Sequence, residues 1–221
     1  MKKYNVSGVT KNAMLQAAGR LFAEKGPAAV TAKEVAEAAG ASPNAVTYHF
    51  GGREGLVQAV WNYVLQVWKH SEMDGYWQRN RHLLETRDGK RQLVSEVVER
   101  IFRIIYVRGE DRWISRLALR AMLLGDGRGF IEKRIVTPWS IQIQELYGVL
   151  TGSSDQEKAL CWAYQILSGI TMLAANICPE GVSRGDGGED DRLYRRLLHT
   201  TTQNALFSAG LLRPSGEGEW S

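Results

Sequence analysis

The sequence predicts an all-α fold of about nine helices. Its apolar residues recur at helical spacing along most of the chain. No segment alternates apolar and polar residues as a half-buried strand does, and no hairpin turn joins two segments. Glycine-rich breaks separate the later helices. With 44% hydrophobic and 24% charged residues, the 221-residue chain is globular rather than disordered or fibrous.

The first two helices are predicted over residues 10–25 and 32–39. The second begins with Thr31 followed three residues later by Glu34, a capping-box pattern in which each side chain bonds a free backbone N–H of the other residue. The first helix carries an apolar stripe of Leu15, Ala18 and Phe22.

A tight turn and a third short helix follow. Gly40 begins the turn, Ser42 is a good N-cap, and Pro43 suits the first helical position because its missing N–H is not needed there. The third helix is therefore predicted over 43–49. Two short helices joined by a three-residue turn make a helix-turn-helix motif over 31–50.

The rest of the chain predicts longer helices. Residues 75–92 are polar without a clean stripe and predict a loop or a frayed segment, and the composition of 214–221 predicts a disordered tail. The longer helices are predicted at 53–74, from Leu93 onward, and at 110–124, 129–150, 155–177 and 190–210.

Charge and tryptophan are distributed unevenly. The net charge is +4, and residues 1–60 hold seven basic and four acidic residues, a net of +3. All seven tryptophans lie beyond residue 60. This asymmetry predicts two regions with different tasks, divided into residues 1–60 and 61–213.

Several classes of protein are disfavoured by what the sequence lacks. It has no long apolar run for a membrane span and no signal peptide, so a cytoplasmic protein is expected. It has no Gly-x-Ser-x-Gly elbow, phosphate-binding loop or dinucleotide fingerprint, so it is not expected to be an enzyme or to hold a cofactor. His49 has no second ligand at metal-binding spacing, so no metal site is predicted.

The third helix presents hydrogen-bonding side chains outward. Asn44, Thr47, Tyr48 and His49 are left exposed when the apolar positions pack inward, and each can bond DNA bases or phosphates. Alternatively, the unit is a compact three-helix structure whose polar face only meets water.

Three linked segments decide between these alternatives. Leu21–Gly26, Val35–Ser42 and Tyr48–Leu56 agree in residue type and spacing with the N-terminal domain of TetR/AcrR-family transcriptional regulators, which this chain resembles over residues 10–60. The resemblance implies a domain that binds a double-stranded DNA operator, followed by a helical domain that dimerises and binds an inducer.

The resemblance also implies which residues contact DNA. One position departs from the family pattern, since the tyrosine common two residues before His-Phe is Thr47 here, with Tyr48 beside it. Alanine at Tyr48 or Arg53 is expected to weaken DNA binding with little loss of fold. The implied DNA-binding residues are Thr31, Lys33, Ser42, Pro43, Asn44, Thr47, Tyr48, His49 and Arg53.

The region 61–213 is expected to sense a small molecule or a protein. Several of its tryptophans and methionines fall on apolar helix faces, where they either form plain core or line a pocket for an apolar or aromatic ligand. A stretch from Arg116 to Pro179 is similar to the CecR-like subgroup. The candidate ligand-binding residues are Trp113, Leu117, Met122, Trp139, Ile143, Trp162, Ile166 and Met172.

The last two helices are expected to pair with their copies in a homodimer, as the resemblance implies. Two recognition helices would then lie about one DNA turn, roughly 34 Å, apart, and the operator would be a pseudo-palindrome. The expected interface residues are Leu160, Ile170, Leu173, Ile177, Leu193, Leu197 and Leu206.

The leading hypothesis is a repressor that releases its operator when the ligand binds. Two alternatives remain: a DNA-binding regulator whose C-terminal region docks a protein partner, and an enzyme that uses an aromatic pocket.

Overall fold

The computed structural model of the chain describes residues 3–69, 73–106, 111–124, 128–174 and 188–212. These residues form helices and turns, with no strand among them, so the predicted all-α fold is confirmed. The predicted tail 214–221 lies outside the described residues. The helices are α1 (Lys3–Lys25), η1 (Pro27–Ala29), α2 (Ala32–Ala38), α3 (Ala45–Phe50), α4 (Arg53–Lys69), α5 (Tyr76–Arg79), η2 (Arg81–Glu85), α6 (Arg87–Ile105), α7 (Arg112–Leu124), α8 (Arg128–Ile131), η4 (Glu132–Val136), α9 (Thr137–Thr151), α10 (Gln156–Ala174) and α11 (Gly188–Ser208).

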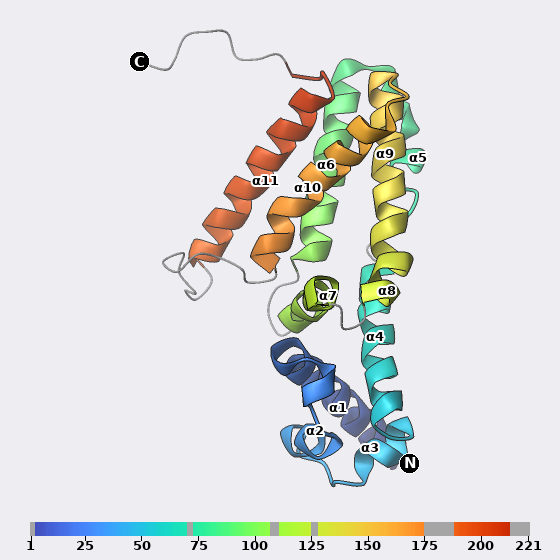
Figure 1. Cartoon of the computed structure of the whole chain (residues 1–221), viewed down its shortest axis with the longest axis vertical. Coiled ribbons are helices and arrows are strands. Elements are labelled where there is room, and N and C mark those ends of the chain that lie inside the picture. The colour runs from blue at the N-terminus through green and yellow to red at the C-terminus, as the bar shows by residue number, and fades with distance from the viewer. Residues whose placement is uncertain (1–2, 70–72, 107–110, 125–127, 175–187, 213–221) are drawn as a thin grey trace. The chain divides into compact units, whose positions relative to one another are not determined.

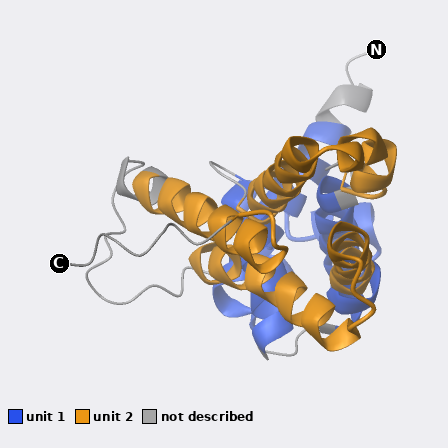
Figure 2. Ribbon diagram, turned by 90° about the horizontal axis from the view of Figure 1, so that it is seen from above, with its two compact units in different colours: residues 1–70, 107–135 blue, residues 71–106, 136–221 orange. Residues whose placement is uncertain are grey.

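The chain divides into two compact units, coloured separately in Figure 2. Unit 1 comprises Met1–His70 and Val107–Ile135, and unit 2 comprises Ser71–Tyr106 and Val136–Ser221. Helices α7 and α8 thus belong to the same unit as the helix-turn-helix, because α7 packs along α1. These compact units differ from the two functional regions predicted from the sequence, residues 1–60 and 61–213. That functional division stays a prediction.

Unit 1 is organised around α1, which contacts α2, α4 and α7 (Figure 1). Small residues of α1 let the neighbouring helices approach closely, and its aromatic residue Phe22 fills space between them. Helix α4 also contacts α3, so the recognition helix is supported from one side by a much longer helix. The most deeply buried side chains of this unit include Met14, Ala18, Phe22, Val35, Val46, Leu56 and Val60.

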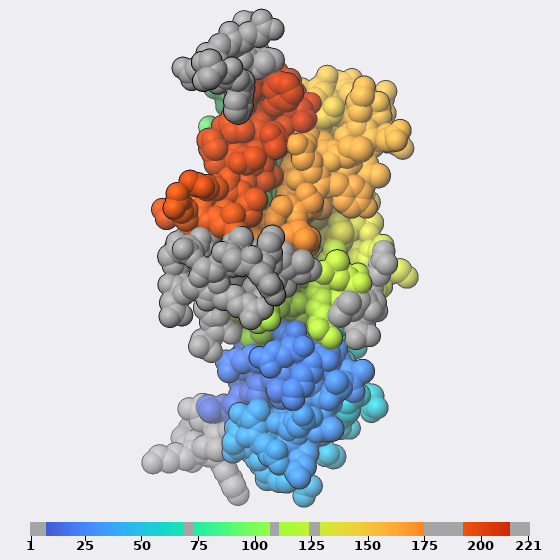
Figure 3. Space-filling view, turned by 60° about the vertical axis from the view of Figure 1, so that its left-hand side comes forward, coloured from blue at the N-terminus to red at the C-terminus, as the bar shows by residue number. Residues whose placement is uncertain are grey.

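Unit 2 is built around α6 and α10. Helix α10 packs against α6, α9 and α11, and Figure 3 shows α10 and α11 side by side at the surface. The Trp162 indole N–H donates to the carbonyl oxygen of Ala205 at 2.9 Å, which joins α10 to α11 inside the unit. The buried core of α6 is Leu93, Val94, Val97, Val98, Ile101, Phe102, Ile104 and Ile105.

The predicted start of the third helix is wrong by two residues. Helix α3 begins at Ala45 with Asn44 as its N-cap, and no side chain caps it. The backbone N–H of Ala45 instead bonds the carbonyl oxygen of Ser42 at 2.9 Å, so Ser42 and Pro43 form a turn before the helix. Ser42 is therefore exposed in the turn and not the N-cap.

Two later boundaries also differ. The predicted loop 75–92 contains α5, η2 and the first turn of α6, which begins at Arg87 because Thr86 caps it by accepting the Gly89 N–H. Polar residues fill that first turn, so it leaves no apolar stripe. The single helix predicted over 129–150 is broken into α8, the π-helical turn η4 and α9, and Pro138, which lacks an N–H, lies in the first turn of α9.

Among the described residues, no helix has both the length and the apolar character needed to cross a bilayer.

Candidate nucleic-acid interface

Helix α2 begins with the capping box predicted from its sequence. The Thr31 backbone N–H donates to Glu34 Oε2 at 2.8 Å, and the Glu34 N–H donates to Thr31 Oγ1 at 3.2 Å. Lys25 Nζ donates to Glu34 Oε1 at 3.1 Å. The Thr31 backbone bond, then the Thr31 hydroxyl and Lys25, lower the pKa of Glu34 to about 2. Glu34 thus stays ionised and fixes the start of α2.

Helix α3 has one buried side chain and an outward face. Val46 is buried, whereas Tyr48 is 81% exposed, although a tyrosine ring is large and largely apolar. The His49 ring meets the Tyr48 ring edge-on with centroids 4.8 Å apart, and Lys11 Nζ lies 5.6 Å from the Phe50 ring centroid. The Tyr48 ring therefore contacts the His49 ring, and the rest of its surface is accessible to a binding partner.

Arg53, one of the implied DNA-binding residues, bonds the protein's own backbone. Its Nε donates to the carbonyl oxygen of Val30 at 3.1 Å, and its Nη2 donates to that of Pro27 at 2.5 Å. These two bonds attach the first residue of α4 to the segment that precedes α2. The expectation that alanine at Arg53 would leave the fold nearly intact is therefore revised.

The junction between α3 and α4 is tight. Gly51 ends α3 in the left-handed region with φ 75°, and its N–H bonds the carbonyl oxygen of Thr47. A Cβ atom at Gly55 would collide with the carbonyl oxygen of Phe50. The end of α3 therefore lies directly against the first turn of α4.

Helix α7 also lies close to α1. The Trp113 ring packs against Gly19, where a Cβ atom would come nearer to the ring than the 3.0 Å that real Cβ atoms keep. The indole N–H donates to Gln16 Oε1 at 2.8 Å, and the ring stacks on Tyr63 with centroids 5.9 Å apart. Sequence reasoning missed these partners of Trp113. A glycine inside the α1 stripe was the only local signal of a close approach.

All nine predicted DNA-binding residues lie in one segment of unit 1, between the start of α2 and the start of α4. Lys33 is exposed and lies 3.8 Å from Glu37. The structure does not test contact with DNA, so these assignments stay predictions. Thr31, Lys33, Ser42, Pro43, Asn44, Thr47 and Tyr48 are exposed, and His49 and Arg53 are half-buried.

The predicted ligand-binding residues are spread over both units, on α7, α9 and α10. Trp113 and Trp162 each use the indole N–H for a bond inside their own unit. Whether any of the eight binds a ligand stays a prediction. Trp113, Leu117, Trp139, Ile143, Trp162 and Ile166 are buried, Met122 is half-buried and Met172 is exposed.

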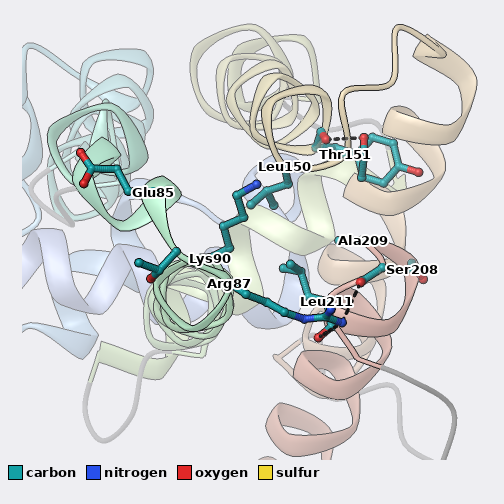
Figure 4. Close-up of a pocket in the computed structure, with 11 residues that line it drawn as sticks. Glu85, Arg87, Lys90, Leu150, Thr151, Ser208, Ala209 and Leu211 are labelled. Atoms are coloured by element: carbon teal, nitrogen blue, oxygen red, sulfur yellow. Dashed lines mark hydrogen bonds between the residues drawn. The ribbon is translucent and has the colours of Figure 1, made fainter.

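Two of the cavities in unit 2 are lined by described residues. The larger, of about 520 Å³, opens between the start of α6 and the ends of α9 and α11 (Figure 4). Arg87 reaches across it and donates to the carbonyl oxygens of Gly210 and Leu211, both at 3.3 Å. The smaller, of about 460 Å³, is lined in part by Trp162, which is the one predicted ligand residue on either wall.

The predicted dimer residues have mixed environments. Leu160 is exposed, Leu193 and Leu197 are half-buried, and Ile177 lies outside the described residues. Tyr164 and Phe207 are exposed on the same two helices and were missed by sequence reasoning. The remaining members, Ile170, Leu173 and Leu206, are buried inside unit 2.

A short helix with an outward face, packed against α2 and α4, is the arrangement of a helix-turn-helix, in which the second helix enters the DNA major groove. Residues 14–60 match the family described as "Bacterial regulatory proteins, tetR family". The match covers the helix-turn-helix domain, so the chain is similar to this family over that domain. No curated protein matches it. The similarity of Arg116–Pro179 to the CecR-like subgroup stays a prediction.

Solved structures share this fold. A proposed TetR-family transcriptional regulator from Mesorhizobium loti is 20% identical over 91% of this chain and 96% of its own, with a TM-score of 0.51. A proposed fatty acid metabolism regulator from Clostridium perfringens is 14% identical over 89% and 97%, with a TM-score of 0.60. AibR, in complex with isovaleryl coenzyme A and operator DNA, is 16% identical over 86% and 97%, with a TM-score of 0.51.

Proposed function

We propose that this protein is a sequence-specific repressor that binds a pseudo-palindromic operator as a homodimer and releases it when a small apolar or aromatic ligand binds. The observation that carries the proposal is the outward face of α3, where Tyr48 is 81% exposed while Val46 anchors the helix. Groups aimed outward from a braced helix suit base-edge and phosphate contacts. The chain acts by binding rather than by catalysis, and in the cytoplasm, where its DNA lies.

Dimerisation uses the outer face of α10 and α11. Leu160, Tyr164, Met172 and Phe207 are exposed apolar or aromatic residues on these two helices. In helix-turn-helix dimers the two recognition helices lie about 34 Å apart in successive major grooves, so the operator that we propose is a pseudo-palindrome. The solved complex of AibR with operator DNA and a coenzyme A thioester supports a ligand-responsive function for this fold.

Recovery of genomic fragments bound by the full-length protein identifies the operator, and gel shifts then measure its affinity. Alanine at Tyr48 is expected to weaken binding about tenfold or more, because a good base or phosphate contact contributes about 1–3 kcal/mol. Val149→Ala, which truncates an exposed residue of α9, is the matched control.

Two results would overturn the proposal. One is equal operator retention by the parent, the Tyr48→Ala variant and the control. The other is affinity that stays flat between about 50 and 200 mM salt, since phosphate contacts release counterions and weaken steeply with salt.

A further inference from the structure

The charge of helix α7 is unusual. Its 13 residues include three arginines and no acidic residue. Arg112, Arg116 and Arg120 are each four residues apart, so they form one row along the helix, and Leu123 continues that row three residues further on. Like charges at this spacing destabilise an isolated helix, so the row needs another explanation.

Two of these arginines also lack the partners that several other described arginines have. Arg116 and Arg120 are half-buried, and no described residue gives either one an ion pair or a hydrogen bond. The Nε atom of Arg120 is buried without a hydrogen-bond partner. By contrast, Arg53 bonds two carbonyl oxygens and Arg91 bonds both Asp88 and Leu211.

An unsatisfied buried guanidinium N–H costs free energy, and an unneutralised charge that is partly withdrawn from water adds to that cost. Two guanidinium groups one helical turn apart match the geometry of a carboxylate or phosphate, whose oxygens accept several parallel N–H bonds. Leu123 is 56% exposed on the same row, so an apolar group lies within reach of the two charges.

We infer that Arg116 and Arg120 bind the anionic group of an amphipathic effector, a carboxylate or a phosphate, whose apolar portion rests on Leu123. The inference rests on the proposed function and narrows its ligand from an apolar molecule to an amphipathic anion. Helix α7 packs on α1 through Trp113 and Gly19, within the unit that contains the recognition helix. Binding at this row therefore acts on the DNA-binding unit through a direct contact.

The test uses three probes with the same ten-carbon chain: decanoate, decyl phosphate and decanol, each below its critical micelle concentration. Binding to the full-length protein is followed by tryptophan fluorescence, since Trp113 lies on α7 itself, and operator release is followed by gel shift. The variants are Arg116→Gln and Arg120→Gln. The control is Arg103→Gln, which removes an exposed arginine of α6.

Decanoate, decyl phosphate or both are expected to bind saturably and release the operator, and decanol is not. The two anions distinguish a carboxylate effector from a phosphate effector. Each α7 variant is expected to bind the active probe about tenfold more weakly, because a charge-assisted bond contributes about 1.5–3 kcal/mol. The unliganded Arg120→Gln protein is expected to melt no lower than the parent, since it loses an uncompensated charge.

Failure of the inference is separable from failure of the proposed function. If the parent binds its operator but no anionic probe releases it, or if the probes act equally on the α7 variants and the control, the inference is overturned and the regulator remains. If Arg116→Gln or Arg120→Gln weakens operator binding without any probe, the arginines serve DNA and the inference is again overturned.

Discussion

Replacing Gly19 by alanine tests the contact between α1 and α7, because two opposing effects act at this position. Alanine in a helix interior stabilises by about 0.5–1 kcal/mol relative to glycine. The new methyl group, however, would overlap the Trp113 ring, and overpacking of this kind costs about 1–3 kcal/mol. Trp113 is bonded to Gln16 and stacked on Tyr63, so it has little freedom to move aside. We expect a net loss of about 1 kcal/mol, or a melting temperature lower by about 2–4 °C.

Gly8→Ala provides the matched control on the same helix. Nothing lies within 4 Å of a Cβ atom at Gly8, so only the gain in helix propensity remains, and the melting temperature is expected to rise slightly. Differential scanning calorimetry of the two variants and the parent measures both shifts. A Gly19→Ala protein that melts at or above the Gly8→Ala protein would refute the tight α1–α7 contact. A double-mutant cycle with Trp113→Phe should show coupling, because the smaller ring relieves the overlap.

Arg53→Ala is expected to lower stability by roughly 1–3 kcal/mol as well as to weaken operator binding, because two partly buried carbonyl oxygens lose their charged donor. Arg53→Lys keeps the charge but cannot span both oxygens, so full stability in this variant would indicate that Arg53 serves only DNA phosphate. Thr31→Ala should lower stability by about 1 kcal/mol in thermal melts through loss of the cap, and no change would contradict the capping box. The pKa of Glu34 is about 2 in the fold and 4.5 in an unperturbed carboxyl, so its stabilising effect is fully present above about pH 4.5 and is lost as the pH falls through about 2. The melting temperatures of the parent and Glu34→Gln should therefore converge in acid, and a constant difference would contradict this origin.

Features that depend on nearby residues could be predicted from the sequence. The capping box needs only Thr31 and Glu34, which are three residues apart, and it was predicted correctly. The start of α3 was missed because Ser42 and Pro43 favour a helix start by residue type, yet the chain uses them in a turn. The start of α6 was missed because its first turn is polar and leaves no periodic signal.

Features that depend on residues far apart in the chain could not be predicted from the sequence. Arg53 bonds carbonyl oxygens 23 and 26 residues earlier, and nothing in the local sequence distinguishes that arrangement from a contact with phosphate. The same limit applies to Trp113, whose partner Gln16 is 97 residues away. Periodicity identified the outward face of α3 and the exposure of Tyr48, but it gave no information on which residues brace that face.

The packing of Trp113 on Gly19 limits how this protein can be recombined with its relatives. A chimera that exchanges DNA specificity at residue 60 would combine the α1 of one protein with the α7 of another, and a side chain at position 19 would then meet a foreign ring. Exchange that carries α7 together with residues 1–69 keeps this pair matched. In this chain, the smallest DNA-binding unit that could be transferred intact is therefore discontinuous in sequence.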